Sequence, residues 1–226
     1  MTTTNTTMTT IMTTETGAAP VPDVIAPPPE PLRRFSWDIQ SMVELADDPR
    51  EILMIGRDLM GRLVAQDDWL PEVFARLDGA PFRQYQLYAD QMTRFTVVAT
   101  VLAPGAALPL CEQTVWELAG VLRGEVVRQL RALPEGASPV VRAPEKRLGA
   151  GAVDAFSPKD GDGLAIANGS ATAPAILIAV HGAEIDGAAR RTVAPDGSVG
   201  SFTTVYANPP EAPAWNILTI QARITD

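Results

Sequence analysis

The sequence is poor in several residue types on which structural and binding sites commonly depend. It has one cysteine, so no disulfide can form within the chain, which fits a reducing compartment. It has 18 lysines and arginines against 27 aspartates and glutamates, a net charge of -9, whereas phosphate recognition needs clustered cations. We therefore expect no nucleic-acid partner, and we interpret the basic pairs Arg33-Arg34 and Arg190-Arg191 as solvated surface.

Long apolar runs are also missing. No stretch of about 18 consecutive apolar residues occurs, so we expect no membrane-spanning helix and no membrane partner. The first residues lack a basic segment followed by an apolar one, which is unlike a secretory signal. A cytoplasmic protein is the default expectation. With 46% hydrophobic residues among 226, the chain is long enough for one sizeable core with a small helical annex.

Threonine and proline dominate the first part of the chain. The runs MTTTNTTMTTIMTTET and APVPDVIAPPPEP contain too few apolar residues to offset the entropic cost of ordering their backbone. Residues 1–34 are therefore predicted to form a disordered tail. The alternative is a recognition arm, because proline-rich segments can dock in the polyproline II conformation.

Helical spacing of apolar residues follows over residues 35–80, which we expect to form the annex. Ser36 is a candidate cap for a first helix. Asp48-Pro49 provides an N-cap acid and a proline at the first helical position, so it predicts the start of a second helix. The apolar stripe behind it is typical of a core-facing helix. A third, short helix is expected at residues 71–77.

Residues 81–226 change to short β-rich runs separated by turn signals such as Pro104-Gly105 and Arg123-Gly124. The expected strands fall at residues 95–102, 115–122, 125–130, 140–142, 152–156, 164–167, 175–181 and 202–206. Short strands at this spacing, without intervening helices, predict an antiparallel sandwich or jelly roll. We therefore predict a mainly β fold, a jelly-roll barrel with an N-terminal helical annex. Residues 214–224 alternate poorly and are expected to cover a sheet edge or a partner subunit.

Two sets of residues in the β-rich part keep the intervals of known motifs. The first set is Gly105, Cys111, Gln113, Glu117 and Gly124, and the second is Gly161, Leu164 and Asn168. The first matches the first cupin motif, which carries two histidines and a glutamate, and the second matches the second cupin motif. The runs RQYQLYADQMTRFTVV and TVWELAGVLRGE further resemble bacterial proteins of the cysteine dioxygenase-like, or thiol dioxygenase, branch of the cupin superfamily.

The resemblance implies a cupin barrel whose usual members bind ferrous iron through three histidines. At those three positions this chain has Cys111, Gln113 and Leu164. The family also uses a Ser-His-Tyr set, which is replaced here by Leu177, Ala179 and His181. Leucine offers no lone pair and neutral amides are poor iron ligands. We therefore expect neither the three-histidine iron site nor thiol dioxygenation.

Strand alternation gives an independent view of the same residues. Cys111, Gln113, Val115 and Glu117 share one face if their strand is regular, and Leu177, Ala179 and His181 share a face of another. The family alignment turns both faces inward. Apolar neighbours disfavour a charged carboxylate, which suits Glu117 to proton transfer with His181. In the alternative interpretation, Glu117 turns to the barrel mouth and His181 caps a strand end.

Cys111 has three interpretations: a small core residue, a thiolate nucleophile activated by His181, or a soft metal ligand. Gln113 is expected to contact a ligand, because a buried amide needs partners. Tyr85 and Tyr88 lie in the segment where thiol dioxygenases commonly carry a group that binds the substrate carboxylate. The predicted substrate-binding residues are Gln113, Tyr85, Tyr88, Leu164 and Ala179.

We predict an atypical cupin enzyme that acts on a small organic molecule without the usual iron, in secondary metabolism. Glu117, His181 and Cys111 are the predicted catalytic residues, for an isomerisation, elimination, cyclisation or related rearrangement. No cofactor is expected. In one alternative, Cys111, Glu117 and His181 hold a divalent metal; in another, the chain is a non-catalytic cupin that binds a small molecule. Because cupins commonly dimerise through sheet edges, a homodimer fits the resemblance.

Overall fold

The computed structural model describes residues 26–46 and 48–218, and two helices open this part of the chain. They are α1 (Glu30–Leu45) and α2 (Pro49–Leu63), and a short 3-10 turn, η1 (Glu72–Phe74), follows. The predicted start of α2 is confirmed, because the Asp48 side chain accepts a hydrogen bond from the backbone N–H of Arg50. Neither described helix is long and apolar enough to cross a membrane.

Helix α1 begins earlier than predicted. Pro31 lies in its first turn, where the backbone N–H that proline lacks would have no partner within the helix. The last residues of the proline-rich run therefore form the start of the helix. Leu32 is fully buried, and Ser36 is buried inside the helix instead of capping it. The predicted tail boundary at residue 34 is therefore too late. Residues 1–25 of that tail lie outside the described residues.

Eleven strands, connected by turns and loops, follow in the rest of the described chain. They are β1 (Phe82–Ala89), β2 (Thr96–Leu102), β3 (Glu117–Arg123), β4 (Glu125–Ala132), β5 (Val140–Val141), β6 (Lys146–Gly149), β7 (Val153–Phe156), β8 (Gly163–Asn168), β9 (Ala175–His181), β10 (Ala189–Val193) and β11 (Val199–Thr203). The mainly β fold with an N-terminal helical annex is confirmed. The strands predicted from the sequence lacked β1, β6 and β10 and placed β11 too late in the chain.

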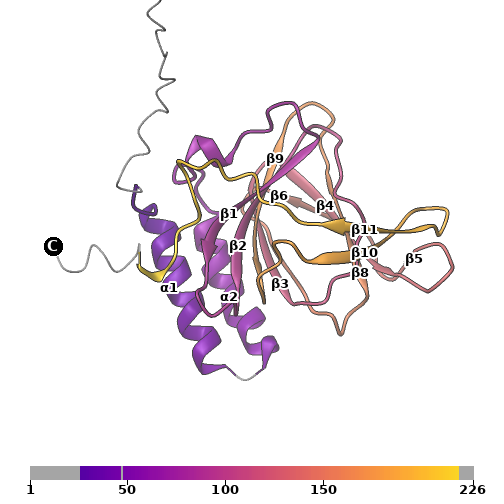
Figure 1. Cartoon of the computed structure of the whole chain (residues 1–226), viewed down its shortest axis with the longest axis horizontal. Coiled ribbons are helices and arrows are strands. Elements are labelled where there is room, and N and C mark those ends of the chain that lie inside the picture. The colour runs from indigo at the N-terminus through magenta and orange to yellow at the C-terminus, as the bar shows by residue number, and fades with distance from the viewer. Residues whose placement is uncertain (1–25, 47, 219–226) are drawn as a thin grey trace, which may run out of the picture.

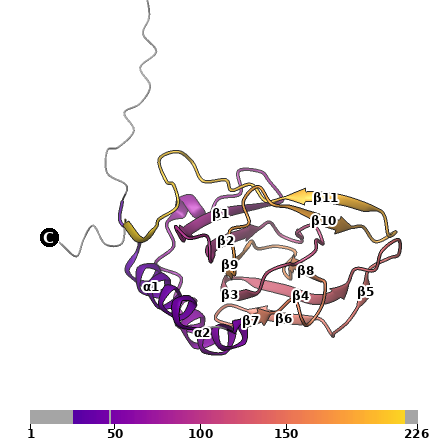
Figure 2. The same ribbon diagram turned by 60° about the horizontal axis from the view of Figure 1, so that its bottom comes forward.

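The strands form two main sheets that face each other across the barrel interior. One sheet has the order β1-β2-β9-β3-β7, and every pair in it is antiparallel. In the other, β8 pairs with β4, and β6 and β5 also pair with β4. Strands β10 and β11 form a separate hairpin, which lies at the far side of the barrel from the two helices (Figures 1 and 2).

Two apolar clusters hold these layers together. The larger lies between the helices and the outer face of the five-stranded sheet, and the smaller lies inside the barrel. Strands β2 and β9 are therefore buried on both faces along their whole length. This explains why their sequences are mostly apolar and do not alternate.

The predicted cover of a sheet edge is confirmed for the described part of the C-terminal run. Trp215 donates its backbone N–H to the carbonyl of Leu87 at 3.0 Å, and its own carbonyl accepts from Ala89 at 2.8 Å. Strand β1, the edge of the five-stranded sheet, is thereby shielded. Residues 219–224 of this run lie outside the described residues.

Candidate functional site

A small pocket inside the barrel collects most of the predicted site residues. Glu117 at the start of β3 and His181 at the end of β9 are direct cross-strand partners. Both line the pocket with Cys111, Gln113, Leu164, Leu177 and Ala179, so the predicted common cavity is confirmed. Its volume is about 20 Å³, which is room for about one water molecule.

Glu117 is not surrounded by apolar groups alone. One of its carboxylate oxygens accepts a hydrogen bond from Arg128 on β4, and the side chains of both residues are at most 2% exposed. Arg128 Nη1 also lies 3.2 Å from Asp154 Oδ2, without hydrogen-bond geometry. Asp154 in turn accepts from Lys146 Nζ at 2.7 Å. The apolar enclosure expected for Glu117 is therefore wrong, because the Arg128 guanidinium pairs with its carboxylate. The sequence pattern gives no sign that Arg128 turns inward.

His181 is buried beside this ion pair. Its Nδ1 atom lies 3.6 Å from the second oxygen of Glu117 and has no hydrogen-bond partner among the described residues. Burial lowers the pKa of His181 below 6.5, since it disfavours the imidazolium; Glu117 opposes this effect, while Arg190 and Arg128 add to it. The imidazole is thus neutral at neutral pH and can accept a proton.

Cys111 lies on the same pocket wall and is 4% exposed. Burial raises the pKa of its thiol, and Arg190 only partly opposes this. Because the thiolate is the reactive form, the environment does not activate Cys111 as a nucleophile. Of the three interpretations, the small core residue fits these surroundings best.

Arg190 on β10 is a pocket residue that the sequence interpretation missed. Its Nη2 donates to Thr204 Oγ1 at 2.8 Å and its Nη1 to Gln113 Oε1 at 3.4 Å, while the guanidinium lies 5.6 Å from the centre of the Phe202 ring. Its Nε is buried without a partner among the described residues. The interpretation of Arg190-Arg191 as solvated surface was wrong for Arg190. Prediction of β10 as a strand would have shown that Arg190 and Arg191 point to opposite faces, because neighbouring residues of a strand do so.

Tyr85 and Tyr88 do not reach the pocket. Both are buried in the cluster between helices and sheet, where Tyr85 donates to the carbonyl of Arg76 at 2.7 Å and Tyr88 to Gln40 Oε1 at 3.0 Å. Alternation turns Gln84 of β1 into the pocket and Tyr85 away from it. A register shift between Gln86 and Tyr88 then brings Tyr88 to the helix side as well.

The residues expected in the metal-binding alternative share the pocket but do not converge. Cys111, Glu117 and His181 all line it, yet the described part of the chain contains no group of three His, Cys, Asp or Glu side chains placed to hold a metal ion. Glu117 is engaged by Arg128, which competes for the lone pairs that a metal would use. These three residues do not form a ready ligand set in this arrangement.

Comparisons with solved structures find that this chain is similar to proteins with a cupin fold. No protein-family model matches it. The cupin domain of an XRE-family transcriptional regulator from Enterobacter cloacae is 19% identical, with a TM-score of 0.35 over 46% of this chain and 98% of that one. A cupin superfamily protein from Desulfitobacterium hafniense is 16% identical, with a TM-score of 0.38 over 53% and 94%. Oxalate oxidase in complex with glycolate is 14% identical, with a TM-score of 0.35 over 54% and 55%. Similarities of this size transfer neither ligand nor reaction.

Proposed function

We propose that the chain is an enzyme that performs acid–base chemistry on a small organic anion, with His181 accepting the proton and Glu117 stabilising the imidazolium that results. The observation that carries the proposal is a pair of buried polar atoms, His181 Nδ1 and Arg190 Nε. Neither has a partner among the described residues, although both residues line the barrel pocket. Buried polar atoms are nearly always paired, so these two are suited to meet polar atoms of a ligand.

The charges around the pocket favour an anion. Glu117 and Asp154 are matched by Arg128 and Lys146, whereas Arg190 forms no ion pair with any described residue. A substrate carboxylate would supply the missing partner of the guanidinium. Neutral His181 would take a proton from a carbon or hydroxyl of the substrate, and Glu117 would stabilise the imidazolium that forms.

Substrate entry requires movement of the pocket cover. The cavity of about 20 Å³ is smaller than any organic substrate, and Arg190 and Phe202 of the β10–β11 hairpin form part of its wall. We expect the hairpin to shift when a substrate enters. The proposed reaction is an isomerisation, elimination, cyclisation or related rearrangement, since in each a base that removes a proton from the substrate can start the change; in an elimination the leaving group departs with its bonding electrons.

The proposal extends to ancestry in the cysteine dioxygenase-like branch of cupins. It is supported by the location of Cys111, Gln113 and Leu164, the residues at the family's iron-ligand positions, which do line one pocket. Their replacement would have removed iron chemistry and left the glutamate and the barrel, while His181 stands where the family has a tyrosine. A small molecule remains the proposed partner.

Deuterium exchange tests for proton transfer, whichever of these reactions the chain performs. The full chain is incubated in D₂O with a panel of two- to six-carbon carboxylates, and proton NMR follows the loss of carbon-bound protons. We expect exchange with at least one compound, and a decrease of about 100-fold or more in the Glu117→Gln and His181→Gln variants. Glu112→Gln is the matched control, because Glu112 belongs to a half-exposed ion pair with Arg191.

Equal exchange rates in the two pocket variants and the control would refute this mechanism, provided that circular dichroism shows all three folded. A second candidate function is a non-catalytic barrel that binds a small molecule. The observation in its favour is the close pairing of Glu117 with Arg128, which restrains the carboxylate. Binding of a panel compound without any exchange would support that candidate.

A further inference from the structure

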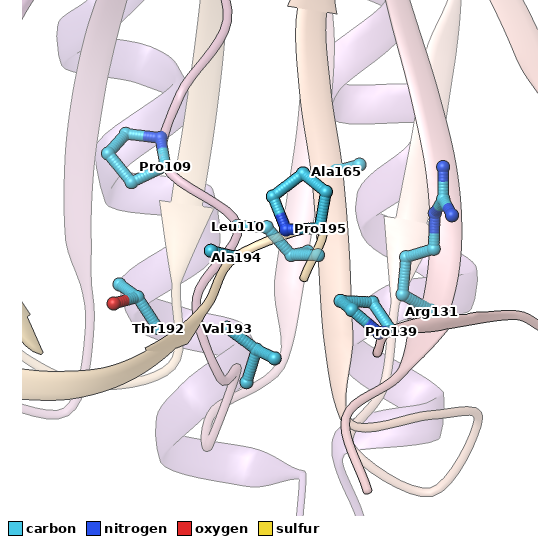
Figure 3. Close-up of a pocket in the computed structure, with 9 residues that line it drawn as sticks. All are labelled: Pro109, Leu110, Arg131, Pro139, Ala165, Thr192, Val193, Ala194 and Pro195. Atoms are coloured by element: carbon cyan, nitrogen blue, oxygen red, sulfur yellow. The ribbon is translucent and has the colours of Figure 1, made fainter. Parts of the chain in front are cut away.

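A larger pocket lies outside the barrel wall, and we propose that it is a second binding site, for a small organic anion with an apolar body. Its volume is about 580 Å³, within the range of about 300–1,000 Å³ typical of pockets for drug-sized ligands. This outer pocket, drawn in Figure 3, is lined by Pro109, Leu110, Arg131, Pro139, Ala165, Thr192, Val193, Ala194 and Pro195.

The outer pocket is separate from the barrel pocket. Ala165 lies between Leu164 and Ile166 on β8, and those two neighbours line the barrel interior, so Ala165 faces outward. Pro109 is the single residue common to the two linings. A ligand in the outer pocket would therefore not contact Glu117 or His181.

The walls of the outer pocket are apolar and held by backbone contacts. Three prolines, Leu110 and Val193 are five of the nine lining residues, and the backbone N–H of Val193 donates to the carbonyl of Leu110 at 3.2 Å. The two loops beyond it meet at Gly197, where a Cβ would lie 3.1 Å from the backbone nitrogen of Ser138. Proline and a close loop contact both limit backbone freedom, so the cavity is formed before a ligand arrives.

Arg131 supplies the charge in this apolar surface. Its Nε is buried with no hydrogen-bond partner, and its guanidinium pairs with no carboxylate among the described residues. Nearby arginines differ: Arg128, Arg147 and Arg191 each have an acidic partner. Arg131 thus carries a positive charge that no described side chain neutralises, beside walls that are mostly apolar. A carboxylate on the ligand would meet this cation.

The ligand class follows from these two features together. An apolar ring or short chain would cover the prolines, leucine and valine, while one carboxylate would face Arg131. The Thr192 hydroxyl adds one polar contact to the lining. Arg131 stands on the opposite side of the pocket from Pro109 and Thr192 in the view of Figure 3, which leaves the apolar surface between the polar groups.

Titration of the full chain with 1-naphthoate tests the site, with 1-naphthalenemethanol as the uncharged match. Methyl-labelled alanine and valine report the location through the signals of Ala165, Val193 and Ala194. We expect those signals to shift and naphthoate to bind about tenfold more tightly than the alcohol. Arg131→Gln should abolish this difference, whereas Arg142→Gln, which changes an exposed arginine outside the pocket, should preserve it.

Two further variants keep the test decisive. Ala194→Leu should weaken both probes by filling the cavity, which checks the site even if Arg131→Gln folds poorly. Glu117→Gln should leave naphthoate affinity unchanged, so a failure of the barrel mechanism would not affect this result. The proposal is overturned if the methyl signals of the outer pocket stay unmoved at millimolar naphthoate, or if Arg131→Gln binds naphthoate as well as the unmodified chain does.

Discussion

Arg128 is the residue whose removal should change the stability of the chain most sharply. Its side chain is 0% exposed, and it holds Glu117, which is 2% exposed, and Asp154, which is 8% exposed. Replacing Arg128 with methionine keeps a similar volume but leaves Glu117 as a buried charge without its partner. Breaking a buried ion pair in this way costs about 3–5 kcal/mol. Asp154 contributes less to the loss, because Lys146 still pairs with it.

Urea unfolding followed by tryptophan fluorescence measures this effect, since the chain has four tryptophans. Arg147→Met is the control: Arg147 pairs with Glu125 at the surface, where the two side chains are 59% and 41% exposed, and its loss should cost about 0.2–1 kcal/mol. The double variant Arg128→Met/Glu117→Gln should recover part of the stability, because it removes the stranded charge. A loss in Arg128→Met no larger than in Arg147→Met would refute this account of the barrel core.

Two other predictions concern the remaining pocket residues. Burial sets the folded-state pKa of His181 below its unfolded value near 6.5, so the unfolded chain binds the proton first as the pH falls. The contribution of His181 to stability is therefore complete above about pH 6.5 and is lost below it. In urea titrations from pH 8 to pH 5, His181→Gln should lessen that loss of stability. An equal loss in the variant would contradict this. Because burial raises the pKa of the Cys111 thiol, a disulfide reagent at pH 7 should react more than about tenfold faster in urea than with the folded chain, and equal rates would show that the thiol is accessible and ionised.

Local chemistry in the sequence was enough to predict several elements. The start of α2 depends on Asp48 and Pro49 alone, and strands β2 and β9 are apolar β-rich runs bounded by turns. The start of α1 was harder, because Pro31 is a helix-start residue within a proline-rich run. Strand β10 has the sequence ARRTV, and its two adjacent arginines do not show the apolar character expected of a strand with one face toward the barrel. The strand was therefore not predicted.

The site was predicted only where cross-strand neighbours follow from spacing. Cys111, Gln113, Glu117 and His181 meet as the motif spacing predicts. The regular strand expected from Cys111 to Glu117 was wrong, because β3 begins only at Glu117, and Val115 does not line the pocket. Arg128 could not be assigned this way, since the inward side of β4 depends on its pairing with β8, which is a tertiary contact. Tyr88 was misplaced for a related reason, because a one-residue register shift reverses the face of a side chain.

The β10–β11 hairpin is a separate two-stranded sheet that contributes Arg190 and Phe202 to the wall of the barrel pocket. Its strands pair with each other from Ala189 to Thr203, and β10 is linked to the segment before β3 by a bridge between Thr192 and Cys111. Strands β2, β3 and β9, which join the two apolar clusters, contribute nothing to it. Substitution of Arg190 and Phe202 would therefore change one wall of the barrel pocket and leave the pairing of β2, β3 and β9 as it is.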